Sequence, residues 1–222
     1  NVVLQNGEFR WSATDIIIKG RKLPIVFDRN YRSSRANDDK PGPLGKGWFG
    51  TYFQYLILQN GGTYTDSFTW HTATGEKYDF TRSNTGYPSK FAPPDGVAAI
   101  AEQSDDYDPV NRHTTELKLQ TSEGLFLWFG TDDDDFGAGS TARLRLERIE
   151  DAYGNSIELS YPSSSYKPNK IYSDVSDRKD SSSYNGYADY IELEYEGGCL
   201  KTVTRKIGEY ADSLWGSPAQ DK

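Results

Sequence analysis

The feature that most constrains this chain is a two-residue alternation of apolar and polar side chains that recurs along most of its length. In the segment 23–31, for example, Ile25 and Phe27 fall on one side of an extended strand, and Asp28 and Asn30 fall on the other. Successive side chains of a β-strand point to opposite faces, so this period is typical of a strand with one buried face. The chain is therefore predicted to form a β-sheet.

Further segments show the same alternation, and most of them are rich in β-branched or aromatic residues, which favour strands. They lie at 8–11, 49–58, 77–80, 116–120, 125–129, 144–149, 156–161, 190–195 and 200–204. Glycine-containing turn signals separate them, such as Asn60-Gly61-Gly62 and Glu196-Gly197-Gly198. Strands joined by such short turns pair as hairpins, so the predicted fold class is all-β, an antiparallel meander of hairpins with little helix.

Evidence for helix is confined to residues 97–103, which carry Ala98, Ala99 and Ala101 after Pro93-Pro94. This segment is either a helix of about two turns or extended chain. Long loops are expected at 33–43, 105–111 and 173–187, and a tail at 211–222.

Composition excludes several classes of protein. Aromatic residues make up 14% of the chain, too many for a disordered protein, and no apolar run is long enough to span a membrane. The net charge of −8, with no Lys/Arg-rich window, argues against a nucleic-acid partner. The chain begins at Asn1 without Met, which leads us to expect a processed or excised piece.

Few residues are available as catalytic groups. The chain has one cysteine, Cys199, and two histidines, His71 and His113, with no accompanying triad or zinc-site spacing. We expect structural or surface roles for all three and predict that the chain is not an enzyme. A single cysteine is compatible with the cytosol or with a bacterial exterior.

Ordered motifs at the start of the chain resemble those of a known family. They read Thr14-Asp15-Ile16-x-Ile18-x-Gly20-Arg21-x-Leu23-Pro24, then Arg29-x-Tyr31-x-Ser33, then Gly42-Pro43-Leu44-Gly45-x-Gly47-Trp48. This order resembles the domain that precedes the repeats in rearrangement-hotspot (Rhs) and tyrosine-aspartate (YD) repeat proteins.

A second group of motifs resembles the repeats of the same family. The first copy reads Leu146-x-x-Ile149-x-Asp151-x-Tyr153-Gly154-Asn155-x-Ile157-x-Leu159-x-Tyr161. A looser copy runs from Ile171 to Tyr195, and a third begins at Leu200. In the second copy Asp177 stands where the family usually has glycine, and the segment from Ser173 to Tyr187 is a long insertion.

The resemblance implies a fold and an organisation. Repeats of this family wind into a spiral β-sheet that forms a hollow shell, often around a toxic C-terminal domain, and this chain would supply only part of such a wall. The implied parts are an Rhs-type β domain at 1–122, two to three YD-like hairpins at 123–210 and a tail at 211–222. A single hairpin is marginal alone, so the units must stack.

Each repeat is expected to turn tightly at its Asp-x-x-Gly-Asn segment. We predict that Gly154 adopts a left-handed conformation, that Asp151 or Asn155 bonds the turn backbone, and that the returning strand ends at Tyr161.

Two acidic runs are candidates for cation binding. Asp132, Asp133, Asp134 and Asp135 form one run, and Asp105-Asp106-x-Asp108 forms the other. Clustered carboxylates suit calcium, although neither run has a complete EF-hand loop. The alternatives are a calcium site and a solvated acidic turn, and no other cofactor is expected.

Tyrosines crowd the segment 161–195. Among them, Tyr166, Tyr172, Tyr184 and Tyr187 are candidates for stacking on a sugar or on a partner protein. The alternative is that these rings pack along the sheet.

These observations favour a non-enzymatic, secreted or cell-surface structural module of the Rhs/YD type. Its partners would be copies of itself, paired through sheet edges at 1–4 or 200–204, or the remainder of a longer chain. The charges of Lys201, Arg205 and Lys206 argue against pairing at the second edge. A carbohydrate- or protein-binding adhesin, and a wall fragment whose parent carries a C-terminal toxin, are the other hypotheses.

Overall fold

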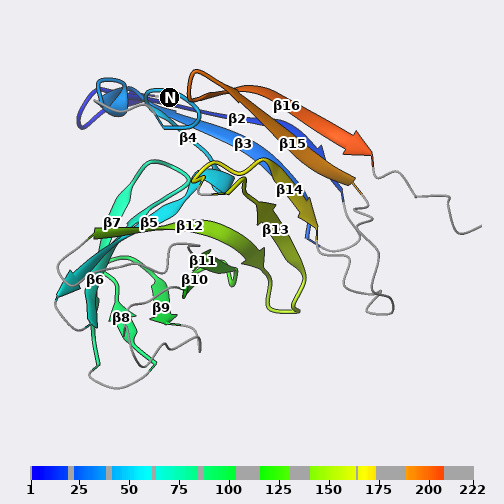
Figure 1. Cartoon of the computed structure of the whole chain (residues 1–222). Helices are drawn as coiled ribbons and strands as arrows, with labels where there is room; N and C mark the ends of the chain where they lie inside the picture. Colours follow the sequence, from blue (N-terminus) through cyan, green and yellow to red (C-terminus); the bar gives the residue numbers. More distant parts are fainter. Residues whose placement is uncertain are drawn as a thin grey trace, which may run out of the picture.

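The computed structural model describes residues 2–19, 23–38, 42–61, 64–84, 88–103, 116–130, 141–163, 165–173 and 189–207. These residues form β-strands, all paired antiparallel, and two three-residue 3-10 helices, η1 (Ser33–Arg35) and η2 (Thr51–Phe53), which confirms the all-β prediction (Figure 1). The strands are β1 (Val2–Val3), β2 (Glu8–Ile18), β3 (Ile25–Arg32), β4 (Trp48–Phe49), β5 (Tyr55–Gly61), β6 (Tyr64–His71), β7 (Lys77–Arg82), β8 (Lys90–Ala92), β9 (Ala99–Gln103), β10 (Glu116–Thr121), β11 (Phe126–Gly130), β12 (Thr141–Glu150), β13 (Ser156–Ser160), β14 (Lys170–Ser173), β15 (Asp189–Glu196) and β16 (Cys199–Ile207). No described helix is long and apolar enough to cross a membrane.

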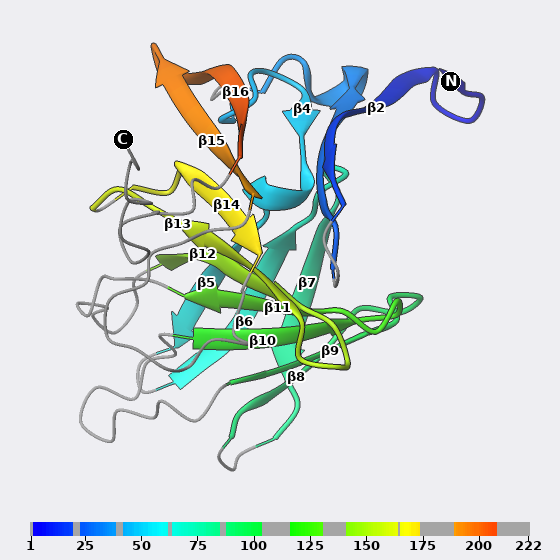
Figure 2. The ribbon, with the colours of Figure 1, turned by 90° about the vertical axis from the view of Figure 1, so that its right-hand side faces the viewer.

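The larger sheet starts as a closed ring and continues as an open ribbon. Strands β5 to β11 follow one another as neighbours, and the ten-residue β12 pairs with both ends of this series. Its first half pairs with β5, from Thr141 opposite Gln59 to Arg145 opposite Tyr55, and its second half pairs with β11. Strands β13 to β16 then leave the ring in sequence order (Figure 2). This arrangement matches the expected partial spiral sheet.

Aromatic side chains fill the ring. The ring of Phe68 stacks on that of Phe80 with centroids 4.7 Å apart, and meets Phe91 at 5.1 Å in an edge-on arrangement. All three are buried, as are Phe129 and Leu144 from the strands that close the ring. Each of these five side chains lies on the inward-facing side of its strand.

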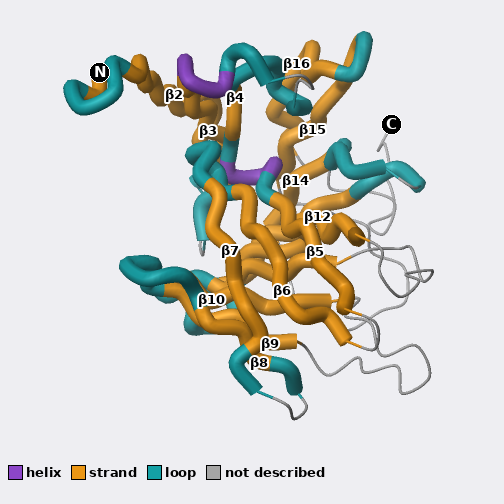
Figure 3. The backbone as a smooth tube through the Cα atoms, turned by 90° about the vertical axis from the view of Figure 1, so that its left-hand side faces the viewer, coloured by secondary structure: helices purple, strands orange, loops and turns teal. Residues whose placement is uncertain are grey.

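The smaller sheet, with strand order β1-β2-β3-β4, lies with β14–β16 on the same side of the ring (Figure 3). Ile25 and Phe27 of β3 belong to the same buried cluster as Ile171 and Ile191 of the ribbon. The two sheets therefore share one hydrophobic core, and burial of these side chains stabilises their association.

A buried carboxylate organises two arginines that reach from the small sheet to the ring. The Glu8 side chain is 1% exposed and accepts hydrogen bonds from Arg32 at 2.8 Å, from Arg10 at 2.6 Å and from Ser34. The same two arginines also reach Glu76 in the turn between β6 and β7. Hydrogen bonds from Arg32, Ser34 and Arg10 lower the pKa of Glu8 to about 2, although burial opposes this shift.

This network predicts a specific loss of stability in acid. Because the pKa of Glu8 is lower in the folded chain than its ordinary value of 4.5, its contribution is complete above that value and is lost as pH falls toward 2. The difference in unfolding free energy between the natural chain and Glu8→Gln should therefore shrink between about pH 5 and pH 2. Urea titrations at several pH values measure it, and a constant difference would contradict the prediction.

Two expectations about secondary structure are wrong. The helical alternative for 97–103 fails, because Ala99, Ala101 and Gln103 are buried on one face of β9, which pairs with β8 and β10. The predicted single strand 49–58 is interrupted by η2, because the Thr51 N–H donates to the Asp28 carboxylate at 3.1 Å. The expected loop at 33–43 begins with the helical turn η1.

Candidate functional site: the repeat hairpins and the outer edge of β16

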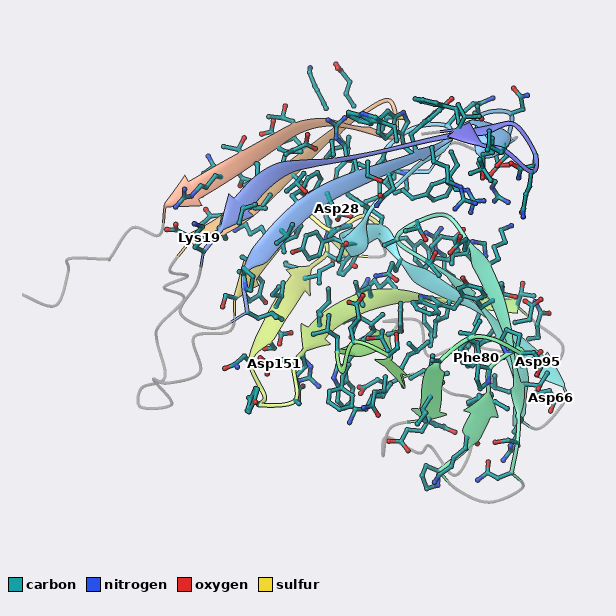
Figure 4. The ribbon with its side chains drawn as sticks, turned by 180° about the vertical axis from the view of Figure 1, so that it is seen from behind. Lys19, Asp28, Asp66, Phe80, Asp95 and Asp151 are labelled. Atoms are coloured by element: carbon teal, nitrogen blue, oxygen red, sulfur yellow. The ribbon has the colours of Figure 1, made fainter. Side chains whose placement is uncertain are left out.

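The turn between β12 and β13 is organised by the Asp151 carboxylate (Figure 4). One oxygen accepts the backbone N–H groups of Tyr153 and Asn155, both at 2.9 Å, and the other accepts the Asn155 side-chain amide at 2.7 Å. Gly154 has a φ of 78°, in the left-handed region, and its N–H donates to the Asp151 carbonyl. The three motif residues therefore form one hydrogen-bonded turn, in which a glycine meets the backbone requirement.

Replacing Gly154 by valine tests how much this turn contributes. A Cβ at this position would contact nothing within 4 Å, so the expected cost is backbone strain alone, about 1–3 kcal/mol of unfolding free energy. Thermal and urea denaturation measure it. An unchanged midpoint would show that the turn accepts a positive φ without strain.

The tyrosines that end the two repeats both donate a hydrogen bond to a backbone carbonyl. The hydroxyl of Tyr161 donates to the Leu146 carbonyl on β12, and that of Tyr195 donates to the Pro168 carbonyl at 2.8 Å. Burial raises the pKa of both phenols. The Arg145 guanidinium lies 4.3 Å from the ring centroid of Tyr161. The two hydroxyl groups therefore connect the end of each returning strand to a neighbouring segment of the backbone.

The four tyrosines named as contact candidates do not form one described surface. Tyr166 is 38% exposed and lies 4.9 Å from the Arg143 guanidinium, whereas Tyr172 is half-buried on β14. Tyr184 and Tyr187 lie outside the described residues. A tyrosine surface for sugar or protein stays a prediction.

The acidic candidates, Asp132 to Asp135 and Asp105 to Asp108, lie outside the described residues, as does His113. Within the described ranges, no group of three or more His, Cys, Asp or Glu side chains is placed to hold a metal ion. Calcium binding at Asp132 to Asp135 therefore remains a prediction.

His71 and Cys199 have places in strands. The His71 imidazole stacks on the Tyr55 ring at 4.1 Å, and burial, with Lys77, Arg143 and Arg35 nearby, lowers its pKa to about 4. It is therefore neutral at pH 7. Cys199 is the first residue of β16 and is a partly buried free thiol.

The last strand of the ribbon has an outer edge that no described strand covers. β16 pairs with β15 along one edge. At its other edge, the one backbone hydrogen bond found among the described residues runs from the Leu200 N–H to the Pro43 carbonyl, at 2.7 Å. The basic side chains expected to protect this edge are ion-paired to β15: Lys201 with Glu196, Arg205 with Asp189 and Lys206 with Glu192. Their charges are thus partly neutralised.

Sequence reasoning missed a row of stacked cations on the outer face of the ring. Lys118, Trp128 and Arg148 lie directly opposite one another on β10, β11 and β12. The Trp128 ring lies between the two cations, 5.0 Å from the Lys118 Nζ and 4.3 Å from the Arg148 guanidinium. The row depends on strand register, for which the separate sequence segments carry no signal.

Comparison of the sequence with known proteins finds a matching family model and relatives from a bacterial strain. Residues 1–80 match a family model described as a domain of unknown function (DUF6531). The chain is 31% identical over 161 residues to the "Probable deoxyribonuclease RhsB" of Dickeya dadantii (strain 3937) and 29% identical to the RhsA protein of the same strain. Each match covers 71% of this chain and 10% of the relative, so the chain corresponds to about a tenth of their length.

One solved structure shares the fold at low sequence identity, and a second gives a lower score. The crystal structure of TcdB2-TccC3-Cdc42 matches 85% of this chain and 11% of that chain, with a TM-score of 0.53 and 14% identity. The N-terminal domain of effector protein SpvB from Salmonella typhimurium strain LT2 matches 82% of this chain and 73% of that chain, with a TM-score of 0.48 and 17% identity. Together with the motifs at 14–48 and 146–161, the relatives identify this chain as a member of the Rhs/YD-repeat proteins.

Proposed function

We propose that this chain is a non-enzymatic structural segment of an Rhs-type β-sheet wall, in which β16 receives the next strand. The observation that carries the proposal is the change from a closed ring, β5–β12, to an open ribbon, β13–β16, whose last edge no described strand covers. A closed ring has no edge of its own to extend, whereas the ribbon adds hairpins in sequence order. The ring thus begins the wall and the ribbon continues it.

The proposed wall role agrees with the similarity to Rhs proteins and does not require that this chain has the activity for which those relatives are named. The matched relatives are named as probable deoxyribonucleases, but this chain corresponds to about a tenth of each, and no reaction is assigned to it from those names. In this proposal, its partner is the remainder of a longer Rhs chain or a further copy, in a secreted or cell-surface setting. A parent chain that also carries a C-terminal toxin is the version implied by the family resemblance.

Hydrogen exchange at the outer edge of β16 tests the wall role. The Leu193 N–H donates to the Asn169 carbonyl, so Leu193 faces β14 and the opposite residue, Val203, directs its N–H away from β15. In the 222-residue chain the Val203 amide should exchange fast. In a chain that continues beyond Lys222, it should exchange on the order of 100-fold more slowly.

The Thr204 amide is the matched control. It faces β15, so it should be protected in both chains. Fast exchange of Val203 in the longer chain as well would overturn the proposal, because no strand would then have been added to β16.

Calcium binding at the acidic run Asp132 to Asp135 is a separate prediction. If the site exists, a chelator should lower the melting temperature and added calcium should restore it, because a ligand that binds only the folded state stabilises it. Magnesium at the same concentration is the control, since the smaller ion suits such flexible oxygen sites less well. Indifference to all three additions leaves only the solvated turn.

A further inference from the structure

The Arg143 guanidinium is a largely buried cation that pairs with no carboxylate of the described residues. Its side chain lies on the face of β12 opposite to the buried Ala142 and Leu144. It contacts two tyrosine rings, with the centroid of Tyr55 at 3.8 Å and that of Tyr166 at 4.9 Å. Its Nε atom is buried without a hydrogen-bond partner among the described residues, and burial lowers the pKa of the group. A buried charge without a counter-charge is costly, so this arrangement indicates a place for an anion.

The other two arginines of β12 have carboxylate partners. Arg145 has a Glu147 oxygen at 3.4 Å, and Arg148 has a Glu150 oxygen at 3.5 Å. Each of the two also stacks on an aromatic ring. Ring stacking alone therefore does not explain why Arg143 lacks a counter-charge.

Two more polar groups lie beside Arg143 without a hydrogen bond to the described part of the chain: the Tyr55 hydroxyl and the His71 imidazole. The His71 ring stacks on the Tyr55 ring at 4.1 Å, with an interplanar angle of 18°. Because β5 lies between β12 and β6, Arg143 and His71 approach the Tyr55 ring from opposite sides. Each lies about 4 Å from that ring, so a tetrahedral oxyanion at the Tyr55 hydroxyl can accept hydrogen bonds of about 2.9 Å from both.

The charges around this stack are mainly positive. Burial and the charges of Lys77, Arg143 and Arg35 all lower the pKa of His71. Lys77 is exposed and lies directly opposite His71 on β7, and no described carboxylate forms an ion pair with it. Arg35, on η1, is paired with Asp38 at 2.9 Å. In the described structure, Arg143 and Lys77 are therefore the two cations around the stack that lack a counter-charge.

One carboxylate acts on His71 in the opposite sense. Asp79 raises the pKa of His71, and it accepts a hydrogen bond from the Thr69 hydroxyl at 2.6 Å. In the strand register, Ile57 and Thr69 stand between Arg143 and Asp79, so this carboxylate belongs to the third strand from β12. The stack therefore keeps two positive charges on a chain whose net charge is −8.

We propose that the Arg143 guanidinium, the Tyr55 hydroxyl and the His71 imidazole bind an oxyanion with about two negative charges, either inorganic phosphate or a phosphomonoester. The tyrosine rings fix the direction of the guanidinium N–H groups, which suits the oxygens of a phosphoryl group. Tyr55 and the neutral His71 each donate one hydrogen bond, and Lys77 supplies the second positive charge.

The position of the site makes it independent of both ends of the chain. Strands β5, β6 and β12 each have a paired strand on both sides. A strand added before β1 or after β16 extends a different edge. The proposal therefore does not depend on the wall role of β16, which uses a sheet edge and not a sheet face.

Titration of the His71 imidazole signal by nuclear magnetic resonance tests the proposal. In a His113→Gln chain His71 is the single histidine, so its signal is unambiguous. Inorganic phosphate at constant ionic strength should shift this signal to saturation and raise the pKa of His71 above about 4, because a nearby anion favours the imidazolium. Tighter binding of glycerol 3-phosphate assigns the phosphomonoester as the source, and weaker binding assigns free phosphate. Absence of a saturable shift with either would overturn the proposal.

Substitutions test which residues form the site. Arg143→Gln should weaken phosphate binding about 10- to 100-fold, because a positive charge and its hydrogen bonds to the anion are lost. Lys77→Gln, at an exposed position, should weaken binding as well. The matched control is Arg148→Gln on the same strand, whose guanidinium is ion-paired, and it should leave binding unchanged. Equal weakening by Arg143→Gln and Arg148→Gln would contradict the site.

Acetate at the same ionic strength tests the charge of the ligand. It carries one negative charge and should bind at least about 10-fold more weakly than phosphate. Equal affinity of the two anions would refute a site for a doubly charged oxyanion.

Discussion

Replacing Phe68 by alanine should lower the free energy of unfolding by about 3–5 kcal/mol, because the ring strands cannot move inward to fill the cavity. Phe68 is 1% exposed and lies between Phe80 and Phe91 in the middle of the closed ring. Each neighbour is itself held by two paired strands, which limits collapse around the lost side chain. Urea denaturation followed by tryptophan fluorescence measures the loss.

The matched control is Phe9→Ala on the small sheet. Phe9 is 44% exposed and its ring lies 6.2 Å from Tyr31, so its removal should cost less than about 1 kcal/mol. Equal losses for the two variants would mean that the interior of the ring is not the main hydrophobic core. The position of β12 between β5 and β11 would then contribute little to stability.

Replacing Gly75 by alanine should cost about 3 kcal/mol or more. Gly75 has a φ of 79°, and a Cβ at this position would lie 2.5 Å from an atom of the Phe49 ring. The added methyl group would strain the backbone and push the turn between β6 and β7 away from the small sheet. The same turn carries Glu76, so the contacts of Glu76 with Arg10 and Arg32 would weaken as well.

Gly124 provides the control for backbone strain. Its φ is also 79°, but a Cβ there would meet nothing within 4 Å. Gly124→Ala should therefore cost only about 1–2 kcal/mol, and the difference between the two variants measures the contact with Phe49. If the two losses were equal, the turn between β6 and β7 would be free to move away from Phe49.

Local hairpins were predictable because their signals lie close together in sequence. The predicted strands 156–161 and 190–195 correspond to β13 (Ser156–Ser160) and β15 (Asp189–Glu196). The turn at 151–155 combines a carboxylate, a glycine and an asparagine within five residues, and all three take part in the turn. Alternation and turn chemistry act over the same short range, so one sequence window contains both.

Ring closure was not predictable because its partners are distant in sequence. Thr141 pairs with Gln59, about eighty residues away in the sequence. Neither segment contains a feature that identifies the other as its partner. The proposed boundary between residues 122 and 123 falls in the turn between β10 and β11, which are neighbours in the closed ring. The domain division at this point stays a prediction, although the ring runs continuously through it.

The sequence by itself determined that the chain forms strands, where its hairpins turn and which family its repeats resemble. Side-chain alternation, glycine conformation and capping by carboxylates are local properties and need no tertiary contact. The tertiary structure decided which edges are covered: β12 closes the ring, Glu8 is buried between two arginines, and the outer edge of β16 lacks a described partner strand. Edge coverage depends on strand order and register, which arise from the summed burial of distant segments, so no local pattern encodes it.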